Sequence, residues 1–187
     1  EYCRENKTSP FNLFVSALAM YVKRATNKED VIIGTTTLNR TNAKEKEMCG
    51  MFVNTCPIRI KIKDTMNFNE IVKSLNISSM SLLRHQKYPY ELLTEDLREK
   101  YDFKDNLFDI VLNYQNAKFE SSDETGINYT TRWHFSGSQV ESLIININDR
   151  EDSGQLIVSY DYLKDCFNFK EIEYLHKHMI GLLWHAL

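Results

Sequence analysis

The sequence predicts an α/β fold, a two-layer sandwich in which one mixed, open sheet carries helices on one face. Two observations predict this fold class. Apolar residues recur at helical spacing in some segments and alternate with polar residues in others, so helices and half-buried strands are interspersed. Several predicted strands also follow one another without an intervening helix, which favours a mixed sheet. With 187 residues, three prolines and no linker-like stretch, the chain is expected to form a single domain.

The first predicted elements are a helix and a strand. Ser9 is a typical helix-capping residue, and Pro10 fits the first helical position, where its missing N–H needs no partner. This helix should end near the polar pair Thr26-Asn27. The apolar run that follows predicts a short buried strand over 30–37, and the charged residues 39–47 predict a loop or a frayed turn.

A strand and two helices are predicted next. The strand covers 51–63, because its second half alternates strictly between apolar and charged residues. Helical spacing of apolar residues predicts a helix over 68–82, and Pro89 is expected to begin a further helix. The inward face of that further helix is expected to consist of Leu92, Leu93 and Leu97.

The second half of the chain is predicted to be richer in strands. A near-continuous apolar run over 107–114 indicates a central strand, and 127–135 is expected to form another. Two alternating segments, 143–148 and 156–160, are separated by Gly154 and predict a hairpin. The chain closes with a predicted helix whose apolar face consists of Ile172, Leu175, Met179, Leu182, Leu183 and Ala186.

The composition argues against several classes of protein. The net charge is only −3 and the basic residues form no stripe, so neither nucleic acid nor an anionic membrane is an expected partner. No apolar run approaches the roughly 20 residues of a spanning helix, and no secretory signal is present at the N-terminus. The four cysteines lack short C-x-x-C spacing and are expected to be reduced thiols of a cytoplasmic protein.

The histidines do not predict a metal site. His176 and His178 are two residues apart on a helix and therefore point in directions about 200° apart. His178 and His185 share a helix face, but no third ligand lies near them in the sequence. His85 follows a predicted helix, where it is either a general base or a cap for the last carbonyl groups, and we favour the cap.

Two further polar positions allow alternative interpretations. Arg40 follows the predicted strand over 30–37 and is either the holder of a carboxylate through paired hydrogen bonds or a solvated loop residue. Spacing alone favours the solvated residue. Asn54 and Thr55 interrupt an apolar strand, so they either form a structural hydrogen-bond node or line a site. These residue patterns form no complete catalytic constellation and, by themselves, indicate no more than a mixed α/β domain.

Several segments, read together, resemble conserved motifs of the C-terminal half of nonribosomal peptide synthetase condensation domains. The order and spacing of the segments match the family over nearly the whole chain. In chain order they are Ser9-Pro10-Phe11, KEDVIIGT at 28–35, Arg40, CGMFVNT at 49–55, HQKYPYE at 85–91 and DNLFDI at 105–110.

The chain departs from the family pattern at a few positions. Thr36 stands where the family usually has proline, and Lys87 replaces an acidic residue. Cys49 replaces the usual isoleucine, while Asp105 and Leu107 stand where the family has arginine and proline. These departures leave the family resemblance intact and predict an acceptor-side surface that differs from the standard one.

The resemblance implies half of a composite enzyme with the fold of CoA-dependent acyltransferases such as chloramphenicol acetyltransferase. In such domains two lobes form a V around a tunnel, and the N-terminal lobe supplies the active-site histidine from an HHxxxDG motif. That motif is not present in residues 1–187, which would form a single C-terminal lobe, a fragment of a larger multidomain chain. The fragment alone is therefore expected to be inactive, with no catalytic residue and no metal ligand of its own.

The resemblance also implies roles for individual residues. Arg40 would pair with the aspartate of the missing motif and support that loop. The polar segment 118–137 would include the latch that crosses to the other lobe. The residues implied to form the tunnel floor or wall are Gly34, Thr35, Asn54, Thr55 and Asn106, and those implied to be structural are Phe52, His85, Gln86 and Pro89.

The implied partners are the N-terminal lobe of the same domain, peptidyl carrier proteins and a nearby adenylation domain. No cofactor would bind directly, because the phosphopantetheine arms of the carrier proteins bring the substrates. An acceptor amine would attack a donor thioester to form a peptide bond. The alternatives are a non-catalytic, condensation-like interaction platform, an epimerisation or heterocyclisation lobe, and a polyketide- or lipid-linked acyltransferase.

Overall fold

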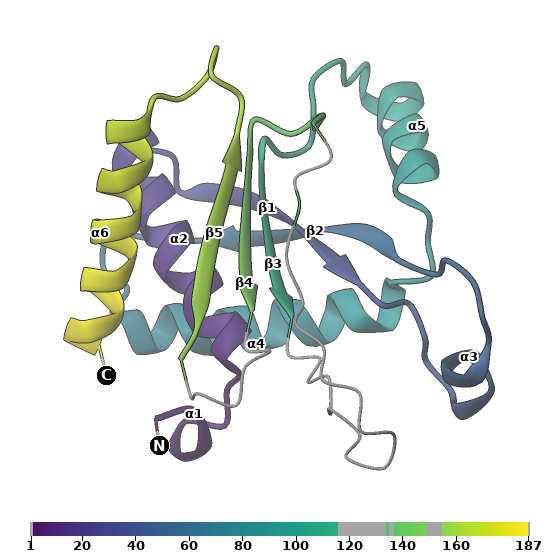
Figure 1. Ribbon diagram of the computed structural model, residues 1–187, viewed down its shortest axis with the longest axis horizontal. Coiled ribbons are helices and arrows are strands. Elements are labelled where there is room, and N and C mark those ends of the chain that lie inside the picture. The colour runs from purple at the N-terminus through teal and green to yellow at the C-terminus, as the bar shows by residue number, and fades with distance from the viewer. Residues whose placement is uncertain (1, 116–133, 135–136, 149–154, 187) are drawn as a thin grey trace.

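A five-stranded mixed sheet organises the structure, a computed structural model that describes residues 2–115, 134, 137–148 and 155–186 (Figure 1). The strand order is β2-β1-β3-β4-β5. The β1–β2 and β4–β5 pairs are antiparallel, whereas β1–β3 and β3–β4 are parallel, which confirms the predicted mixed, open sheet. The elements are α1 (Tyr2–Glu5), α2 (Pro10–Thr26), β1 (Asp30–Thr37), α3 (Ala43–Glu47), β2 (Asn54–Lys61), α4 (Phe68–His85), α5 (Tyr90–Tyr101), β3 (Ile110–Gln115), β4 (Leu143–Asn148), β5 (Ile157–Tyr162) and α6 (Phe169–Ala186).

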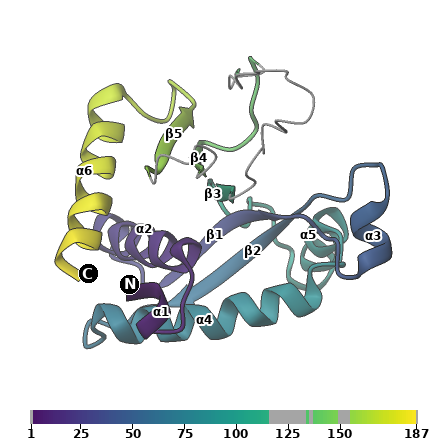
Figure 2. The ribbon, with the colours of Figure 1, turned by 60° about the horizontal axis from the view of Figure 1, so that its bottom comes forward.

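Helices α2, α4 and α6 cover one face of the sheet, which confirms the predicted two-layer arrangement (Figure 2). Successive side chains of a strand point to opposite faces of the sheet, so alternate apolar residues lie under the helices. In β4 these residues are Leu143, Ile145 and Ile147, which are fully buried. The intervening side chains of Ile144 and Asn146 lie on the opposite face and are only partly buried. None of the described helices is both long and apolar enough to span a bilayer.

The helix boundaries follow the local signals in the sequence. The Ser9 hydroxyl accepts a hydrogen bond from the Asn12 N–H at 3.1 Å, and Pro10 is the first residue of α2. Asn27 ends α2 in the left-handed conformation with φ of 55°, a conformation that asparagine tolerates better than most residues. The predicted apolar face of α6 is buried at Ile172, Leu175, Met179 and Leu183.

Some predicted elements differ from the structure. The segment 39–47 contains the short helix α3, because the Asn42 side chain caps the Glu45 N–H. Strand β2 begins at Asn54 and not at Met51, since Thr37↔Asn54 is the last pair of the β1–β2 ladder. The predicted strand over 127–135, the Gly154 turn and most of the segment 118–137 lie outside the described residues.

The predicted inward face of α5 is only partly buried. Leu93 and Leu97 are half-buried, and Leu93 faces β2 across a cavity, whereas Leu92 is 46% exposed. The reason is the position of α5, which projects past the end of the sheet and therefore packs on it over a small area (Figure 1).

The junction between β1 and β3 depends on a close approach at Gly34. Gly34 faces Val111 in the single register pair that joins the two strands. A Cβ atom at this position would lie 2.4 Å from Cε2 of the buried Phe108, closer than any side chain tolerates. Glycine therefore allows the segment before β3 to pack directly against β1.

Candidate functional site

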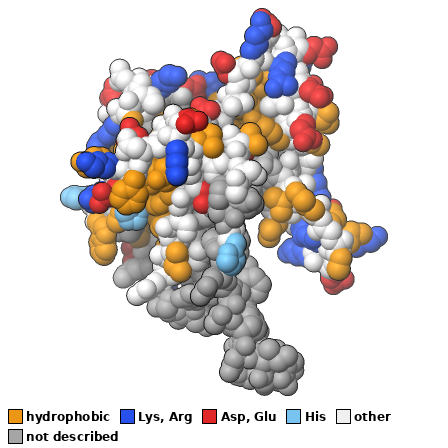
Figure 3. Space-filling view, turned by 45° about the horizontal axis from the view of Figure 1, so that its top comes forward, with side chains coloured by type: hydrophobic (Ala, Val, Ile, Leu, Met, Phe, Trp, Pro, Cys, Tyr) orange, Lys and Arg blue, Asp and Glu red, His pale blue; other side chains and the backbone are white. Residues whose placement is uncertain are grey.

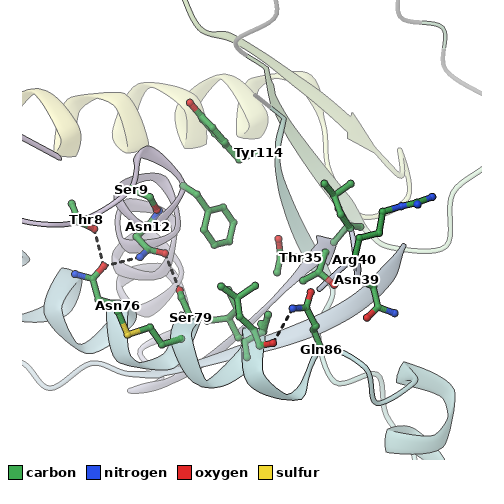
Figure 4. Close-up of a pocket in the computed structure, with 18 of the residues that line it drawn as sticks. Thr8, Ser9, Asn12, Thr35, Asn39, Arg40, Asn76, Ser79, Gln86 and Tyr114 are labelled. Atoms are coloured by element: carbon green, nitrogen blue, oxygen red, sulfur yellow. Dashed lines mark hydrogen bonds between the residues drawn. The ribbon is translucent and has the colours of Figure 1, made fainter. Parts of the chain in front are cut away.

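An open cavity of about 590 Å³ lies where β1 ends, between α2 and α4 (Figure 4). Thr35 and Tyr114 contribute side chains from the sheet, and Phe11 and Met80 contribute apolar surface from the two helices. The loop that leaves β1 completes the wall as far as Arg40. The cavity therefore collects residues from the N-terminal half of the chain and from β3 at one end of the sheet.

A polar network that the sequence analysis missed forms one side of this cavity. The Asn76 Oδ1 accepts hydrogen bonds from the Thr8 hydroxyl at 2.8 Å and from Asn12 Nδ2 at 2.7 Å. The Asn12 Oδ1 in turn accepts a bond from the Ser79 hydroxyl at 2.8 Å (Figure 4). The sequence contains one indication of this network. Asn12, Asn76 and Ser79 lie on helix faces whose other residues are mainly apolar. The network joins α2 to α4 and gives the cavity a fixed polar wall.

Asn39 leaves an unpaired acceptor at the cavity. Its backbone has φ of 53°, and its carbonyl oxygen accepts a bond from Lys87 Nζ at 3.2 Å. Its side-chain Oδ1 is buried and has no hydrogen-bond partner within the described part of the chain. A buried acceptor without a partner is costly, so a donor group that reached this oxygen would stabilise the loop.

Arg40 organises the loop between β1 and β2. Its Nη1 donates to the carbonyl oxygens of Glu45 and Met48, the latter at 2.6 Å, and Nη2 donates to the Gly50 carbonyl at 2.8 Å. The guanidinium also stacks on the Phe52 ring, 4.3 Å from its centroid. The interpretation of Arg40 as a solvated loop residue is therefore wrong, because tertiary folding brings carbonyl groups to it that spacing does not reveal.

An ion pair anchors the same loop to the α4–α5 turn. Lys87 Nζ lies 2.7 Å from Glu45 Oε1. The Glu45 carboxylate also accepts bonds from the N–H and hydroxyl of Thr41 at 2.7 and 3.1 Å. The bond from Lys87, followed by that from the Thr41 N–H, lowers the pKa of Glu45 to about 2. This carboxylate is therefore charged throughout the physiological pH range.

Asn54 is a structural hydrogen-bond node. Its Nδ2 donates to the carbonyl oxygens of Gln86 at 2.9 Å and Tyr88 at 2.8 Å, which ties the start of β2 to the α4–α5 turn. His85 ends α4, and its Nδ1 lies 2.8 Å from the Ser81 carbonyl oxygen. That contact agrees with the capping interpretation of His85.

A second cavity, also of about 590 Å³, lies on the other side of this turn. Thr55, His85 and Tyr90 line it together with Pro57 and Leu93. Pro89 directly precedes α5 and provides no side-chain cap. The two cavities thus flank the segment that Asn54 holds in place.

The structure brings most of the predicted site residues to one end of the sheet. Thr35, Arg40, Asn54 and Gln86 line or support the two cavities there. Asn106 instead lies near Asp30, at the opposite end of β1, about 23 Å away at the usual rise of a strand. Gly34 lies on the opposite face of the sheet from Thr35, where it contacts Phe108.

His176 and His178 make ordinary structural contacts. His176 Nδ1 lies 2.9 Å from the Tyr160 hydroxyl, whose pKa is raised by burial. His178 contacts the Tyr21 ring, with the ring centroids 6.0 Å apart. The described residues contain no group of three or more His, Cys, Asp or Glu side chains that could hold a metal ion.

Comparison with known proteins connects this arrangement to one family. The family model described as "Condensation domain" matches residues 1–187. Surfactin synthase subunit 1 of Bacillus subtilis (strain 168) is 41% identical over 100% of this chain, and a plipastatin synthase from the same organism is 33% identical over 100%. The chain spans only 5% and 7% of these two relatives.

Solved structures share the fold. The condensation domain from the monacolin K polyketide synthase MokA superimposes with a TM-score of 0.81 at 19% identity, covering 97% of this chain and 42% of that one. The X-domain structure solved as a complex with OxyB from teicoplanin biosynthesis gives a TM-score of 0.75 at 19% identity, covering 98% and 41%.

Proposed function

Since this chain belongs to the condensation-domain family, we propose that it is the C-terminal lobe of such a domain in a nonribosomal peptide synthetase. The main support for this proposal is that four predicted site residues lie around one open end of the sheet: Thr35, Arg40, Asn54 and Gln86. The length agrees with it, because the chain covers about two-fifths of the matched condensation-domain structures. The lobe would form one wall of the tunnel in which two substrates meet.

Condensation domains of nonribosomal peptide synthetases are amide-forming acyltransferases. In the proposed reaction the amine of the acceptor attacks the thioester carbonyl of the donor. The C–N bond forms, the C–S bond breaks, and the amine proton ends on the released thiol. The polar wall formed by Thr8, Asn12, Asn76 and Ser79 would face the amide-containing phosphopantetheine arms of carrier proteins.

The lobe alone is proposed to be inactive. Among the described residues, no His, Asp, Glu or Cys side chain lines the cavity between α2 and α4. A general base for the attacking amine would therefore come from the other lobe, where the family places its histidine motif. Residues of this lobe would orient substrates and shape the tunnel.

Arg40 is proposed to support that histidine motif. Three of the five N–H donors of its guanidinium hold backbone carbonyls, which fixes the plane of the group. Within the described residues, the Nε–H and one Nη2–H remain for a carboxylate. These two donors form a fork that suits paired hydrogen bonds to an aspartate of the opposite lobe.

Exposed apolar residues near the cavity are proposed to contact the N-terminal lobe. Leu38 and Met80 line the cavity and are 74% and 63% exposed, and Met51 is 91% exposed. In the space-filling view, charged side chains cover the projecting α5 region and hydrophobic ones gather beneath it (Figure 3). Apolar surface of this kind is typical of a contact with another protein surface. Peptidyl carrier proteins and an adenylation domain of the same synthetase complete the proposed set of partners.

A non-catalytic interaction platform is the second candidate function. The neighbour with a TM-score of 0.75 is an X-domain solved in complex with OxyB, so this fold supports association with another protein. Epimerisation and heterocyclisation lobes are further alternatives that differ in the product they would yield.

The test uses the full-length synthetase with donor and acceptor carrier proteins loaded with aminoacyl groups. We expect an amide-linked product on the acceptor arm, measured by mass spectrometry. Arg40→Lys keeps the charge but loses the fork, and we expect it to lower turnover by about tenfold or more. Arg84→Lys, on an exposed part of α4, is the matched control and should retain turnover.

Product mass and stereochemistry distinguish the alternatives. An additional loss of water would indicate heterocyclisation, and an inverted centre without a new bond would indicate epimerisation. Absence of any product would contradict the proposed function and favour the platform. Equal turnover of Arg40→Lys and the control would contradict the role given to Arg40.

A further inference from the structure

A continuous hydrogen-bonded ladder of polar side chains crosses the sheet on the face opposite α2, α4 and α6. It begins at Thr36 in β1, whose N–H and hydroxyl both donate to the Asn113 Oδ1 in β3, at 3.2 and 2.9 Å. The Asn113 Nδ2 donates to the Asn146 Oδ1 in β4 at 3.1 Å. The Asn146 Nδ2 then donates to the Asp161 Oδ2 in β5 at 3.1 Å. Four adjacent strands are therefore connected by side chains as well as by their backbones.

The chemistry of the two ends fixes the direction of this ladder. The Asp161 carboxylate only accepts hydrogen bonds, so Asn146 must present its amide N–H₂ to it. Asn146 then presents its oxygen to Asn113, and Asn113 must offer its own N–H₂ there. The oxygen of Asn113 is consequently directed at the two donors of Thr36, one of which is a backbone N–H that cannot reverse its role.

The ladder matters most at the junction between β1 and β3. Only one register pair, Gly34↔Val111, joins these strands, whereas six pairs join β3 to β4. The bonds from Thr36 to Asn113 therefore add to a short backbone pairing. Thr35, the neighbour of Thr36, is buried and lines the cavity between α2 and α4. A shift of Thr36 would be transmitted to that wall.

We propose that Asp161 sets the direction of the ladder and that Asn113, through Thr36, is a positioning residue for the cavity wall at Thr35. This role goes beyond the proposed function, which assigns nothing to Asn113, Asn146 or Asp161. The ladder touches no reacting atom, so its effect on any reaction is indirect.

An exchange of the side chains at positions 113 and 161 tests the direction. Asn113→Asp alone places Asn146 between two carboxylates, only one of which can receive its N–H₂ in the present arrangement. Asn113→Asp combined with Asp161→Asn restores a complete ladder in the reverse direction, with the same net charge as the natural chain. In that variant the carboxylate at position 113 accepts from both Thr36 and Asn146, and the amide at position 161 donates to Asn146.

Hydrogen–deuterium exchange of the β3 and β4 segments, measured in the full-length protein, is the readout. We expect Asn113→Asp to accelerate exchange by about tenfold, because the variant loses the amide–amide bond to Asn146 and sets a carboxylate against the Asn146 oxygen. The double variant should return to within about twofold of the natural protein. Asp165→Asn, an exposed aspartate outside the ladder, is the matched control and should change nothing.

The outcomes separate clearly. If Asn113→Asp reduces the yield of folded protein, the double variant must recover it. A double variant that exchanges as fast as Asn113→Asp, or faster, overturns the direction assigned to the ladder. So does an Asn113→Asp variant whose exchange equals that of the Asp165→Asn control.

The positioning part rests on the proposed function and has its own readout. In the carrier-protein condensation assay, turnover should fall in Asn113→Asp and recover in the double variant. Unchanged turnover in Asn113→Asp despite faster exchange overturns the positioning role. A natural protein without condensation activity contradicts the proposed function alone, because the exchange measurement does not depend on turnover.

Discussion

Replacement of Asn54 should destabilise the connection between β2 and the α4–α5 turn. The Asn54 side chain donates to the carbonyl oxygens of Gln86 and Tyr88 at 2.9 and 2.8 Å. A typical intramolecular hydrogen bond contributes about 0.5–1.5 kcal/mol net, so loss of both in Asn54→Ala should cost about 1–3 kcal/mol. Asn54→Asp has nearly the same shape but only accepts hydrogen bonds, so it would place a carboxylate against two carbonyl oxygens. Its cost should therefore exceed that of the alanine variant.

Denaturant unfolding and hydrogen exchange of residues 85–89 measure these two variants in the full-length protein. Asn106→Ala is the matched control, since Asn106 is exposed and its replacement should change stability by less than about 0.5 kcal/mol. The expected order of stability is natural protein, then Asn54→Ala, then Asn54→Asp. An Asn54→Asp variant as stable as the natural protein would refute the hydrogen-bond account. Equal losses in Asn54→Ala and Asn106→Ala would do the same.

Two further predictions concern the same end of the molecule. Gly34→Ala should destabilise the β1–β3 junction by about 1–3 kcal/mol in thermal unfolding, because the alanine Cβ would lie 2.4 Å from Phe108 Cε2. Adding Phe108→Leu to this variant should recover part of the lost stability. Glu45 has a folded pKa lowered to about 2, so its contribution to stability is present above its unfolded pKa of about 4.5 and is lost as the pH falls toward 2. The natural protein and Glu45→Gln should therefore differ in unfolding midpoint by a constant amount near neutral pH, and this difference should shrink below about pH 4.5. A difference that grows on acidification would contradict the lowered pKa of Glu45.

The helices and most strands were predictable because their signals are local. The capping at Ser9, the proline at position 10 and the alternation of Leu143, Ile145 and Ile147 specify elements without reference to the rest of the chain. The exposure of Leu92 on α5 was not predictable in this way. Periodic leucines show which side of a helix is apolar, but they do not show whether another layer lies opposite it.

The sequence indicated some of the residues that lie around the cavity, such as Thr35, Arg40 and Gln86, but not their contacts. Family motifs indicated Arg40 and Asn54, yet their partners are mainly backbone carbonyls of Met48, Gly50, Gln86 and Tyr88. Backbone groups carry no sequence signature, so no pattern reveals which of them meet a given side chain. The ladder through Asn113 has the same origin, because its members come together only through the strand order.

The departures at Thr36 and Lys87 act on the same part of the structure. Thr36 donates through its backbone N–H, a group that proline lacks, and so joins the end of β1 to β3. Lys87 bonds to both the Asn39 carbonyl and the Glu45 carboxylate, and so joins the β1–β2 loop to the α4–α5 turn. Thr36 restrains the β1–β2 loop where it leaves the sheet, and Lys87 restrains the same loop further along the chain. Both restraints therefore act on the cavity wall between Thr35 and Arg40, and Thr36 and Lys87 hold that wall by different contacts.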